Sequence, residues 1–160
     1  MWHRIVETKI TVYSFDELTE SQRDLVEKAK AQVVNAYAPY SGFHVGAAIE
    51  LANGAIFAGN NQENSAYPSG LCAERVAMFY ANAQFPQTAV RRLAIAAYTK
   101  GEFLKSPVTP CGACRQVLLE SETRFDSEIE VLLYGTDEVY VLKNVKQLLP
   151  LCFEKSSLKQ

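Results

Sequence analysis

Helical and strand-like segments alternate along this chain of 160 residues, and no repeat, charge block or Ser/Gly-rich linker divides it. At roughly 150 residues per domain, this length suits one domain. The strongest helical signal runs from Glu20 to about Ala36, where Thr19 can accept a hydrogen bond from a backbone N–H of the first turn. Apolar residues recur there at steps of three and four, which predicts one face packed on a core: Leu25, Val26, Ala29, Val33 and Ala36.

Two β-compatible runs flank the dipeptide Asn53-Gly54, one from Phe43 to Leu51 and one from Ala55 to Asn60. This dipeptide suits a type I′ hairpin turn, so we expect two antiparallel strands. The run from Arg92 to Thr99 carries no charge after its first residue, which is typical of a strand buried on both faces. We therefore expect that strand at the centre of the sheet.

Further segments complete the alternation of helices and strands. Helices are expected from Cys72 to about Ala83 and from Cys111 to about Glu122, strands at 129–134 and 139–142, and a short helix at 145–149. The predicted fold class is α/β, with a three-layer α/β/α sandwich around a five-stranded mixed sheet.

Residues 1–18 are interpreted as an N-terminal extension that precedes a catalytic domain at 19–160. Within the extension, the segment from Arg4 to Tyr13 is expected to form either an extra edge strand or an arm. The opening residues include no apolar signal-peptide region, and no window approaches the roughly 18 apolar residues of a membrane span. We expect a cytoplasmic protein with no membrane partner.

The charge balance bears on the class of partner. Sixteen Lys and Arg residues against eighteen Asp and Glu residues give a formal net charge of -2, without the basic excess that tight nucleic-acid binding usually leaves. We therefore expect no nucleic-acid partner. Four cysteines are too few for the disulfide framework of a small secreted scaffold, and in a reducing compartment they should be thiols.

Three of these cysteines lie at the starts of predicted helices, in Cys72-Ala73-Glu74-Arg75 and in Pro110-Cys111-Gly112-Ala113-Cys114-Arg115-Gln116. Cys111 and Cys114 are one helical turn apart, close enough for their sulfurs to bind one tetrahedral metal ion. The positive end of a helix dipole favours thiolate, which is the form that binds metal. Cys72 would supply a third sulfur if the two helix starts converge.

Three thiolates on Zn²⁺ leave one tetrahedral position open, which is the catalytic pattern. Glu74 would then lie near a water molecule in that position, as a general base and later a general acid, in the layout of the zinc deaminases. Arg75, and as a second candidate Arg115, would draw negative charge off the sulfurs. The alternative is a structural zinc with a fourth protein ligand, for which the candidates are Cys152, His3 and His44.

At these residues the sequence resembles the small, zinc-dependent, tetrameric cytidine deaminases, within the cytidine/deoxycytidylate deaminase superfamily. The resemblance runs in order over most of the chain. It rests on the two cysteine motifs and on four other segments: Tyr37-Ala38-Pro39-Tyr40-Ser41, Phe43-His44-Val45-Gly46-Ala47-Ala48, Asn61-Gln62-Glu63-Asn64-Ser65-Ala66-Tyr67 and Leu148-Leu149-Pro150-Leu151-Cys152-Phe153.

This resemblance implies an enzyme that hydrolytically deaminates cytidine and 2′-deoxycytidine to uridine and 2′-deoxyuridine plus ammonia, by zinc-bound hydroxide, in pyrimidine salvage. It implies one Zn²⁺ per chain on Cys72, Cys111 and Cys114. Glu74 is then the catalytic proton carrier, and Arg75 moderates the charge of the thiolates.

The resemblance also assigns the nucleoside contacts. Asn61 and Glu63 would bind the ribose hydroxyls, Phe43 would pack against the nucleoside, and the main chain near Ala73 and Cys111 would contact the base. Phe153 would close the pocket of a neighbouring subunit in a homotetramer. The spacing of Asn61 and Glu63 independently supports their role in ribose binding, because side chains two residues apart on an extended segment point the same way.

Three other functions stay open on the sequence: deamination of a modified nucleoside or an aminonucleoside antibiotic, zinc-stabilised binding without catalysis, and deamination of RNA or DNA. The short chain has no obvious basic or aromatic groove, which disfavours the last of these. Gln62 stands where the family more often has an aliphatic residue, so we expect either a slightly different position of the ribose loop or another polar contact there.

Overall fold

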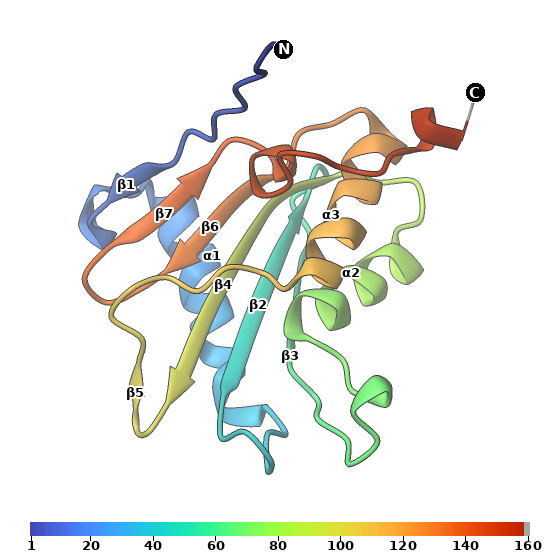
Figure 1. Ribbon diagram of the computed structural model, residues 1–160. Helices are drawn as coiled ribbons and strands as arrows, with labels where there is room; N and C mark the ends of the chain where they lie inside the picture. Colours follow the sequence, from blue (N-terminus) through green and yellow to red (C-terminus); the bar gives the residue numbers. More distant parts are fainter. Residues whose placement is uncertain (159–160) are drawn as a thin grey trace.

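Seven strands form one mixed sheet in the computed structural model of the protein, which describes residues 1–158 (Figure 1). The strands follow one another across the sheet in the order β1-β7-β6-β4-β2-β3, and β5 pairs with β4. Strands β4 and β6 are parallel, whereas the other described pairs are antiparallel. The bounds are β1 Thr11–Tyr13, β2 His44–Leu51, β3 Ile56–Asn60, β4 Val90–Thr99, β5 Glu102–Phe103, β6 Glu130–Tyr134 and β7 Val139–Leu142.

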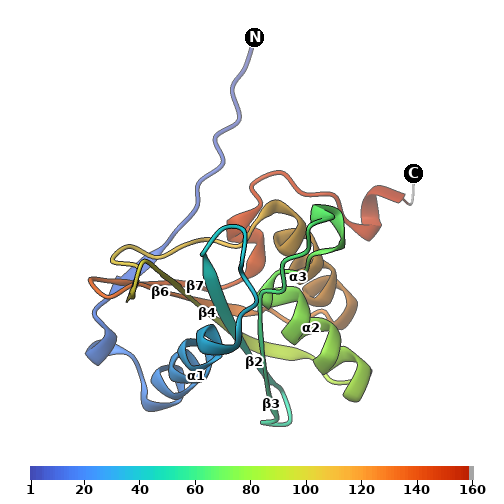
Figure 2. The same cartoon turned by 90° about the horizontal axis from the view of Figure 1, so that it is seen from below.

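Helices cover both faces of the sheet, which confirms the α/β/α sandwich (Figure 2). Helix α1 (Glu20–Ala31) lies on one face, and α2 (Ala73–Gln84) and α3 (Gly112–Phe125) lie on the other. Two buried clusters fill the spaces between the layers, one around Leu25 and Val26 of α1 and one around Met78 and Leu118 of α2 and α3. β4 contributes to both clusters and lies between β6 and β2, as predicted.

Short 3-10 helices connect the larger elements: η1 (Phe15–Glu17), η2 (Gln32–Asn35), η3 (Tyr67–Ser69), η4 (Val145–Leu148) and η5 (Lys155–Leu158). Thr19 caps α1 as expected, since its hydroxyl accepts a hydrogen bond from the amide of Gln22. The prediction that this helix continues to Ala36 was wrong. After Ala31 the chain tightens into η2, where two β-branched valines and an asparagine favour the α-helix less than the residues before them.

The prediction of five strands was wrong as well, because β1 and β5 extend the sheet. Strand β1 pairs with β7 at one edge, so the region of the predicted extension supplies a short edge strand, while residues 1–10 have no regular secondary structure. Leu18, at the end of that extension, is buried in the α1 cluster. Runs of two or three residues are too short to show the alternation that identifies a strand from sequence.

The turn between β2 and β3 differs from the predicted type I′ turn. Gly54 has a φ of +83°, but Asn53 is not among the residues with positive φ, as a type I′ turn would require. The amide of Gly54 donates to the carbonyl oxygen of Leu51, and the amide of Leu51 donates to that of Ala55. This pattern is a type I turn followed by a left-handed glycine, the usual three-residue hairpin loop.

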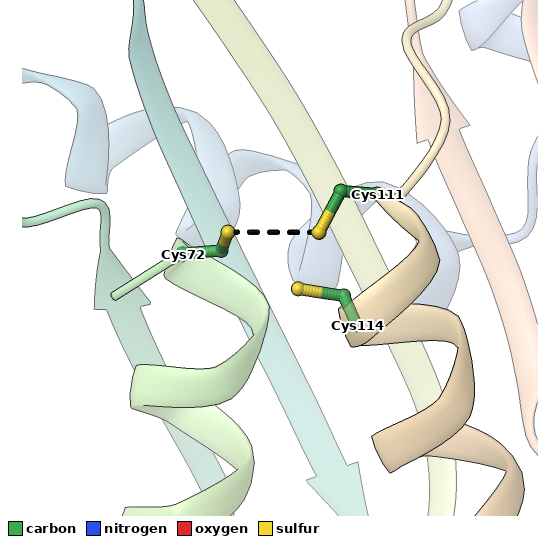
Figure 3. A group of neighbouring side chains, drawn as sticks. All are labelled: Cys72, Cys111 and Cys114. Atoms are coloured by element: carbon green, nitrogen blue, oxygen red, sulfur yellow. Dashed lines mark hydrogen bonds between the residues drawn. The ribbon is translucent and has the colours of Figure 1, made fainter. Parts of the chain in front are cut away.

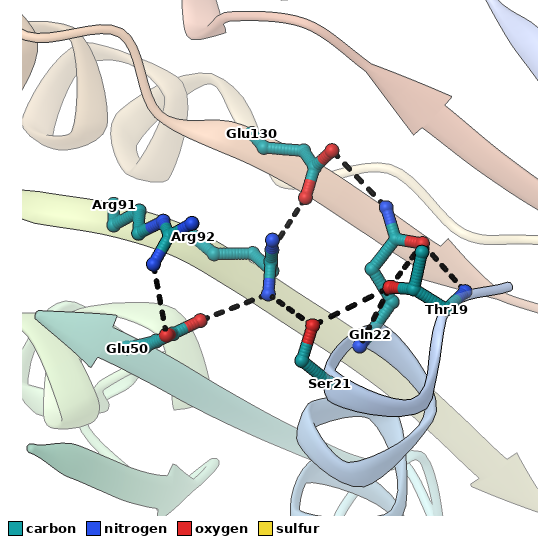
Figure 4. Close-up of polar contacts among 7 residues, drawn as sticks. All are labelled: Thr19, Ser21, Gln22, Glu50, Arg91, Arg92 and Glu130. Carbon is teal, nitrogen blue, oxygen red and sulfur yellow. Dashed lines mark hydrogen bonds and ion pairs between the residues drawn. The ribbon is translucent and has the colours of Figure 1, made fainter. Parts of the chain in front are cut away.

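Close contact between α1 and β2 depends on Gly46. A Cβ atom on Gly46 would lie 2.0 Å from the carbonyl oxygen of Ala29, so a side chain at this position would push the helix off the sheet. At the other end of β2, largely buried Arg92 of β4 contacts Glu50 of β2 and Glu130 of β6 (Figure 4). Ser21 and Gln22 of α1 join this polar network, which ties three strands to the helix. None of the helices within residues 1–158 has the length and apolar character of a membrane span.

Candidate active site

Three cysteine sulfurs meet where α2 and α3 begin (Figure 3). Cys72 is the residue before α2, Cys111 is the residue before α3, and Cys114 lies in the first turn of α3. The three sulfurs all lie within 4.8 Å of one another, and Cys72 Sγ is 3.8 Å from Cys111 Sγ. The predicted convergence of the two helix starts is therefore present in the fold.

This cluster fits a zinc ion. Two sulfurs bound at about 2.3 Å with tetrahedral angles would lie about 3.8 Å apart, the separation that Cys72 and Cys111 already have. Thiolate ligands also suit Zn²⁺ better than the oxygen-seeking Mg²⁺ or Ca²⁺. In the described residues no further His, Cys, Asp or Glu joins the cluster, so Cys152, His3 and His44 do not provide a fourth ligand.

The surroundings of Cys72 favour its thiolate form. Its hydrogen bond with Cys114 and, after it, that with Arg75 lower the pKa of Cys72 to about 5, against the effect of burial. The same sharing of a proton raises the pKa of Cys114. Arg75 donates through a terminal guanidinium nitrogen to Cys72 Sγ across 3.5 Å, so a positive charge lies beside the sulfur cluster.

Glu74 lies in the first turn of α2, two residues after Cys72, and its side chain is buried. Burial raises the pKa of this carboxyl group, because the apolar surroundings penalise the charged form. A carboxyl group in these surroundings can hold a proton nearer to neutral pH than an exposed one, which is what a group that both accepts and donates protons requires.

One pocket of about 430 Å³ joins the cysteine cluster to the predicted nucleoside contacts. Its size is within the usual range of small-molecule sites. The predicted site residues that line it are Phe43, Asn61, Glu63, Cys72, Ala73, Glu74 and Cys111. Ser41, Val45, Ile95, Val108 and Thr109 complete the lining and were not predicted from the sequence. The apolar ones among them are typical of core residues, so their pattern gave no sign of the pocket.

The backbone fixes Asn61 and Glu63 in this pocket. The Asn61 side chain accepts a hydrogen bond from the Val45 amide and donates one to the Phe43 carbonyl oxygen. The Glu63 carboxylate accepts hydrogen bonds from the amides of Tyr40 and Ser41 and from the Ser41 hydroxyl. The pair therefore has defined positions before any ligand binds.

Four predicted residues are not in the pocket lining: Cys114 and Arg75, which lie at the sulfur cluster, and Phe153 and Arg115. Phe153 is on the C-terminal segment, where its side chain is exposed and its carbonyl oxygen accepts a hydrogen bond from Gln116. Arg115 donates to the carbonyl oxygens of Pro110 and Leu148 and to the Thr109 hydroxyl. Its described contacts therefore hold the loop before Cys111, whereas Arg75 contacts a sulfur.

Comparison with known proteins identifies the family of this chain. Residues 19–125 match the family described as "Cytidine and deoxycytidylate deaminase zinc-binding region". The chain belongs to this family. The matched span, a zinc-binding region, includes all three cysteines of the cluster, which could hold one zinc ion.

Individual members are similar over most of their length. The cytidine deaminase of Sporosarcina psychrophila is 40% identical over 134 residues, which are 84% of this chain and 92% of that protein. The cytidine deaminase of Mycoplasma genitalium is 33% identical over 82% of this chain and 95% of its own length. The crystal structure of cytidine deaminase from Burkholderia pseudomallei is matched over its whole length and 85% of this chain, with 38% identity and a TM-score of 0.69.

Proposed function

We propose that the protein hydrolytically deaminates cytidine and 2′-deoxycytidine to uridine and 2′-deoxyuridine, with release of ammonia, in pyrimidine salvage. The observation that carries this proposal is one pocket lined by Glu74, by Asn61 and Glu63, and by Cys72 and Cys111, two of the three cysteines whose sulfurs cluster together. The relatives named cytidine deaminase support the choice of substrate.

Cys72, Cys111 and Cys114 would hold the zinc ion as thiolates. Bound there, zinc supplies a Lewis acid that lowers the pKa of a water molecule. Three protein ligands leave room for that water, as in other catalytic zinc sites. Arg75 would offset the negative charge of the thiolates from its position beside Cys72. Arg115 would also offset this negative charge, but more weakly than Arg75, because it contacts the loop before Cys111 and not a sulfur.

Glu74 would carry the protons of the reaction. Its carboxylate accepts a proton from the attacking water and delivers it to N3 of the pyrimidine as the oxygen adds to C4. It then transfers the proton of the new C4 hydroxyl group to the amine, which leaves as ammonia. The raised pKa of the buried carboxyl group suits this alternation between acceptor and donor.

Asn61 and Glu63 would bind the ribose, since an amide and a carboxylate together offer a donor and acceptors to sugar hydroxyls. Phe43 would pack on the nucleoside, and the backbone at Ala73, at the start of α2, would contact the base. All four residues line the same pocket, which supports their assignment to one ligand. The pocket suits a free nucleoside rather than a polynucleotide.

We also infer a cytoplasmic homotetramer whose pockets are completed by neighbouring subunits. Large aromatic side chains are exposed on α2 and on the C-terminal segment: Phe79, Tyr80 and Phe153. Exposed apolar residues in such groups mark surfaces that another chain covers. In this arrangement Phe153 would close the pocket of an adjacent copy. Light scattering should give four chains per particle, and a monomer would contradict this inference.

The experiment that tests the proposal follows cytidine by its absorbance with purified protein, beside a metal assay. We expect about one zinc per chain, loss of the cytidine band and stoichiometric ammonia. A panel of modified nucleosides and aminonucleoside antibiotics identifies any other substrate. Zinc-loaded protein that deaminates neither cytidine nor 2′-deoxycytidine would refute the substrate assignment.

A further inference from the structure

The hydroxyl group of Ser41 connects two residues that line the pocket. Its oxygen accepts a hydrogen bond from the Phe43 amide across 3.0 Å, and its proton is donated to Glu63 Oε1. Ser41 itself lines the same pocket. One hydroxyl group therefore sets the position of the carboxylate and of the backbone that carries Phe43.

Backbone groups hold the other oxygen of the same carboxylate. Glu63 Oε2 accepts from the Tyr40 amide across 2.8 Å and from the Ser41 amide across 3.2 Å. The two segments are also joined directly, since the Glu63 amide donates to the carbonyl oxygen of Tyr37 across 2.8 Å. The loop that precedes β2 is thus built around this side chain.

The hydrogen bonds from Tyr40 and Ser41 leave one acceptor position of the Glu63 carboxylate free for a ligand. A carboxylate accepts at about four lone-pair positions, and these three donors occupy three of them. The remaining position can accept from one ligand hydroxyl. A carboxylate fixed in this way binds that hydroxyl without losing side-chain freedom at the time of binding.

We propose that Ser41 is a positioning residue of the sugar subsite, and that it acts on the substrate through Glu63. This inference rests on the proposed function, because it requires a substrate whose sugar hydroxyl contacts Glu63. Ser41 does not take part in the chemistry at C4. Its contribution through Glu63 should therefore depend on the sugar hydroxyls, whereas an effect through the Phe43 amide would appear with every nucleoside.

The test compares two nucleosides in the zinc-loaded enzyme. For Ser41→Ala we expect kcat/KM for cytidine to fall about tenfold, with most of the change in KM, because the loss of a hydrogen bond to a charged group weakens binding by about this factor. For 2′,3′-dideoxycytidine, which lacks the 2′- and 3′-hydroxyl groups that Glu63 would bind and keeps only the 5′-hydroxyl, kcat/KM should change less than twofold. Ser41→Thr keeps the hydroxyl group and should restore most of the cytidine activity.

Ser14 provides a matched control far from the pocket in the sequence. Its hydroxyl and its amide both donate to Glu17 Oε2, an arrangement like that of Ser41 and Glu63. Ser14→Ala should leave both nucleosides unaffected. Equal losses on cytidine and 2′,3′-dideoxycytidine in Ser41→Ala, or no loss on either, would overturn the inference while the proposed function stands. A wild-type enzyme that converts no cytidine would instead refute the proposed function.

Discussion

The side-chain amide of Asn61 holds the backbone of Phe43, since its Nδ2 donates to the Phe43 carbonyl oxygen across 2.9 Å. An aspartate at position 61 has no donor and would place a carboxylate against that carbonyl oxygen. We expect Asn61→Asp to lower the free energy of unfolding by about 2 kcal/mol and kcat/KM for cytidine by at least about tenfold. Urea denaturation and steady-state kinetics measure the two effects.

Asn53 is the control for this substitution. Its side-chain oxygen accepts from the Ala55 amide, a contact that a carboxylate can also make. Asn53→Asp should therefore change stability and activity little. If the two substitutions had equal effects, the donation from Asn61 to Phe43 would have no special importance.

Arg115 has a geometry that a lysine cannot reproduce. Its guanidinium donates to Pro110, Leu148 and Thr109, each across 2.8 Å. Arg115→Lys keeps the positive charge but not the fork of donors, so we expect a loss of about 1–3 kcal/mol in the free energy of unfolding. Zinc affinity should fall with it, because Pro110 precedes the ligand Cys111.

The comparison variant is Arg124→Lys, since the guanidinium of Arg124 makes one exposed hydrogen bond, to the carbonyl oxygen of Pro86, and otherwise lies over the Phe125 ring, where a lysine can also place its charge. That change should shift the urea midpoint very little. Full stability and zinc affinity in Arg115→Lys would show that a positive charge at this position is sufficient. It would contradict the inference that the three hydrogen bonds of Arg115 stabilise the loop before Cys111.

Glu122 gives a pH dependence of stability. Its buried carboxylate accepts from the Ile129 and Val145 amides, and burial raises its pKa above the ordinary 4.5. The folded state then takes up the proton at a higher pH than the unfolded state does. The contribution of this group to the free energy of unfolding is fully present below pH 4.5 and is lost as the pH rises through the raised pKa.

The test compares wild type with Glu122→Gln, which keeps an acceptor oxygen for both amides but does not titrate. The free energy of unfolding of the wild type, relative to that of the variant, should rise as the pH is lowered toward 4.5. Urea curves at several pH values between neutrality and that point measure it. A difference that stays constant, or that falls, would show that the pKa of Glu122 is not raised.

The sequence predicted the elements whose patterns are long. The capping residue Thr19, the uncharged run of β4 and the three helices were all found near their observed places. The errors lie where local sequence carries less information. Strand β5 has two residues, and its pairing with β4 depends on the chain returning after Lys100, a contact that no periodicity shows.

The metal ligands were predictable because their chemistry restricts residue type and spacing. Cys72 is forty-odd positions away from Cys114 along the chain, yet both lie at the start of a helix, and helices on the same face of a sheet bring those starts together. Ser41 lies in one of the segments that resemble the family, but the sequence alone indicates no role for it. Its importance comes from a hydrogen bond to Glu63, twenty-two residues away, that only the fold reveals.

If the buried carboxyl group of Glu74 carries protons for a reaction at the adjoining cluster of three sulfurs, removing its charge should stop uridine formation without loss of the metal. The most direct test measures bound zinc and uridine formation in Glu74→Gln, with exposed Glu120→Gln as the matched control. We expect about one zinc per chain in both variants, near-normal turnover in the control, and kcat for cytidine lowered at least about a hundredfold in Glu74→Gln. Glu74→Gln enzyme that binds zinc and forms uridine at the wild-type rate would contradict this role of Glu74.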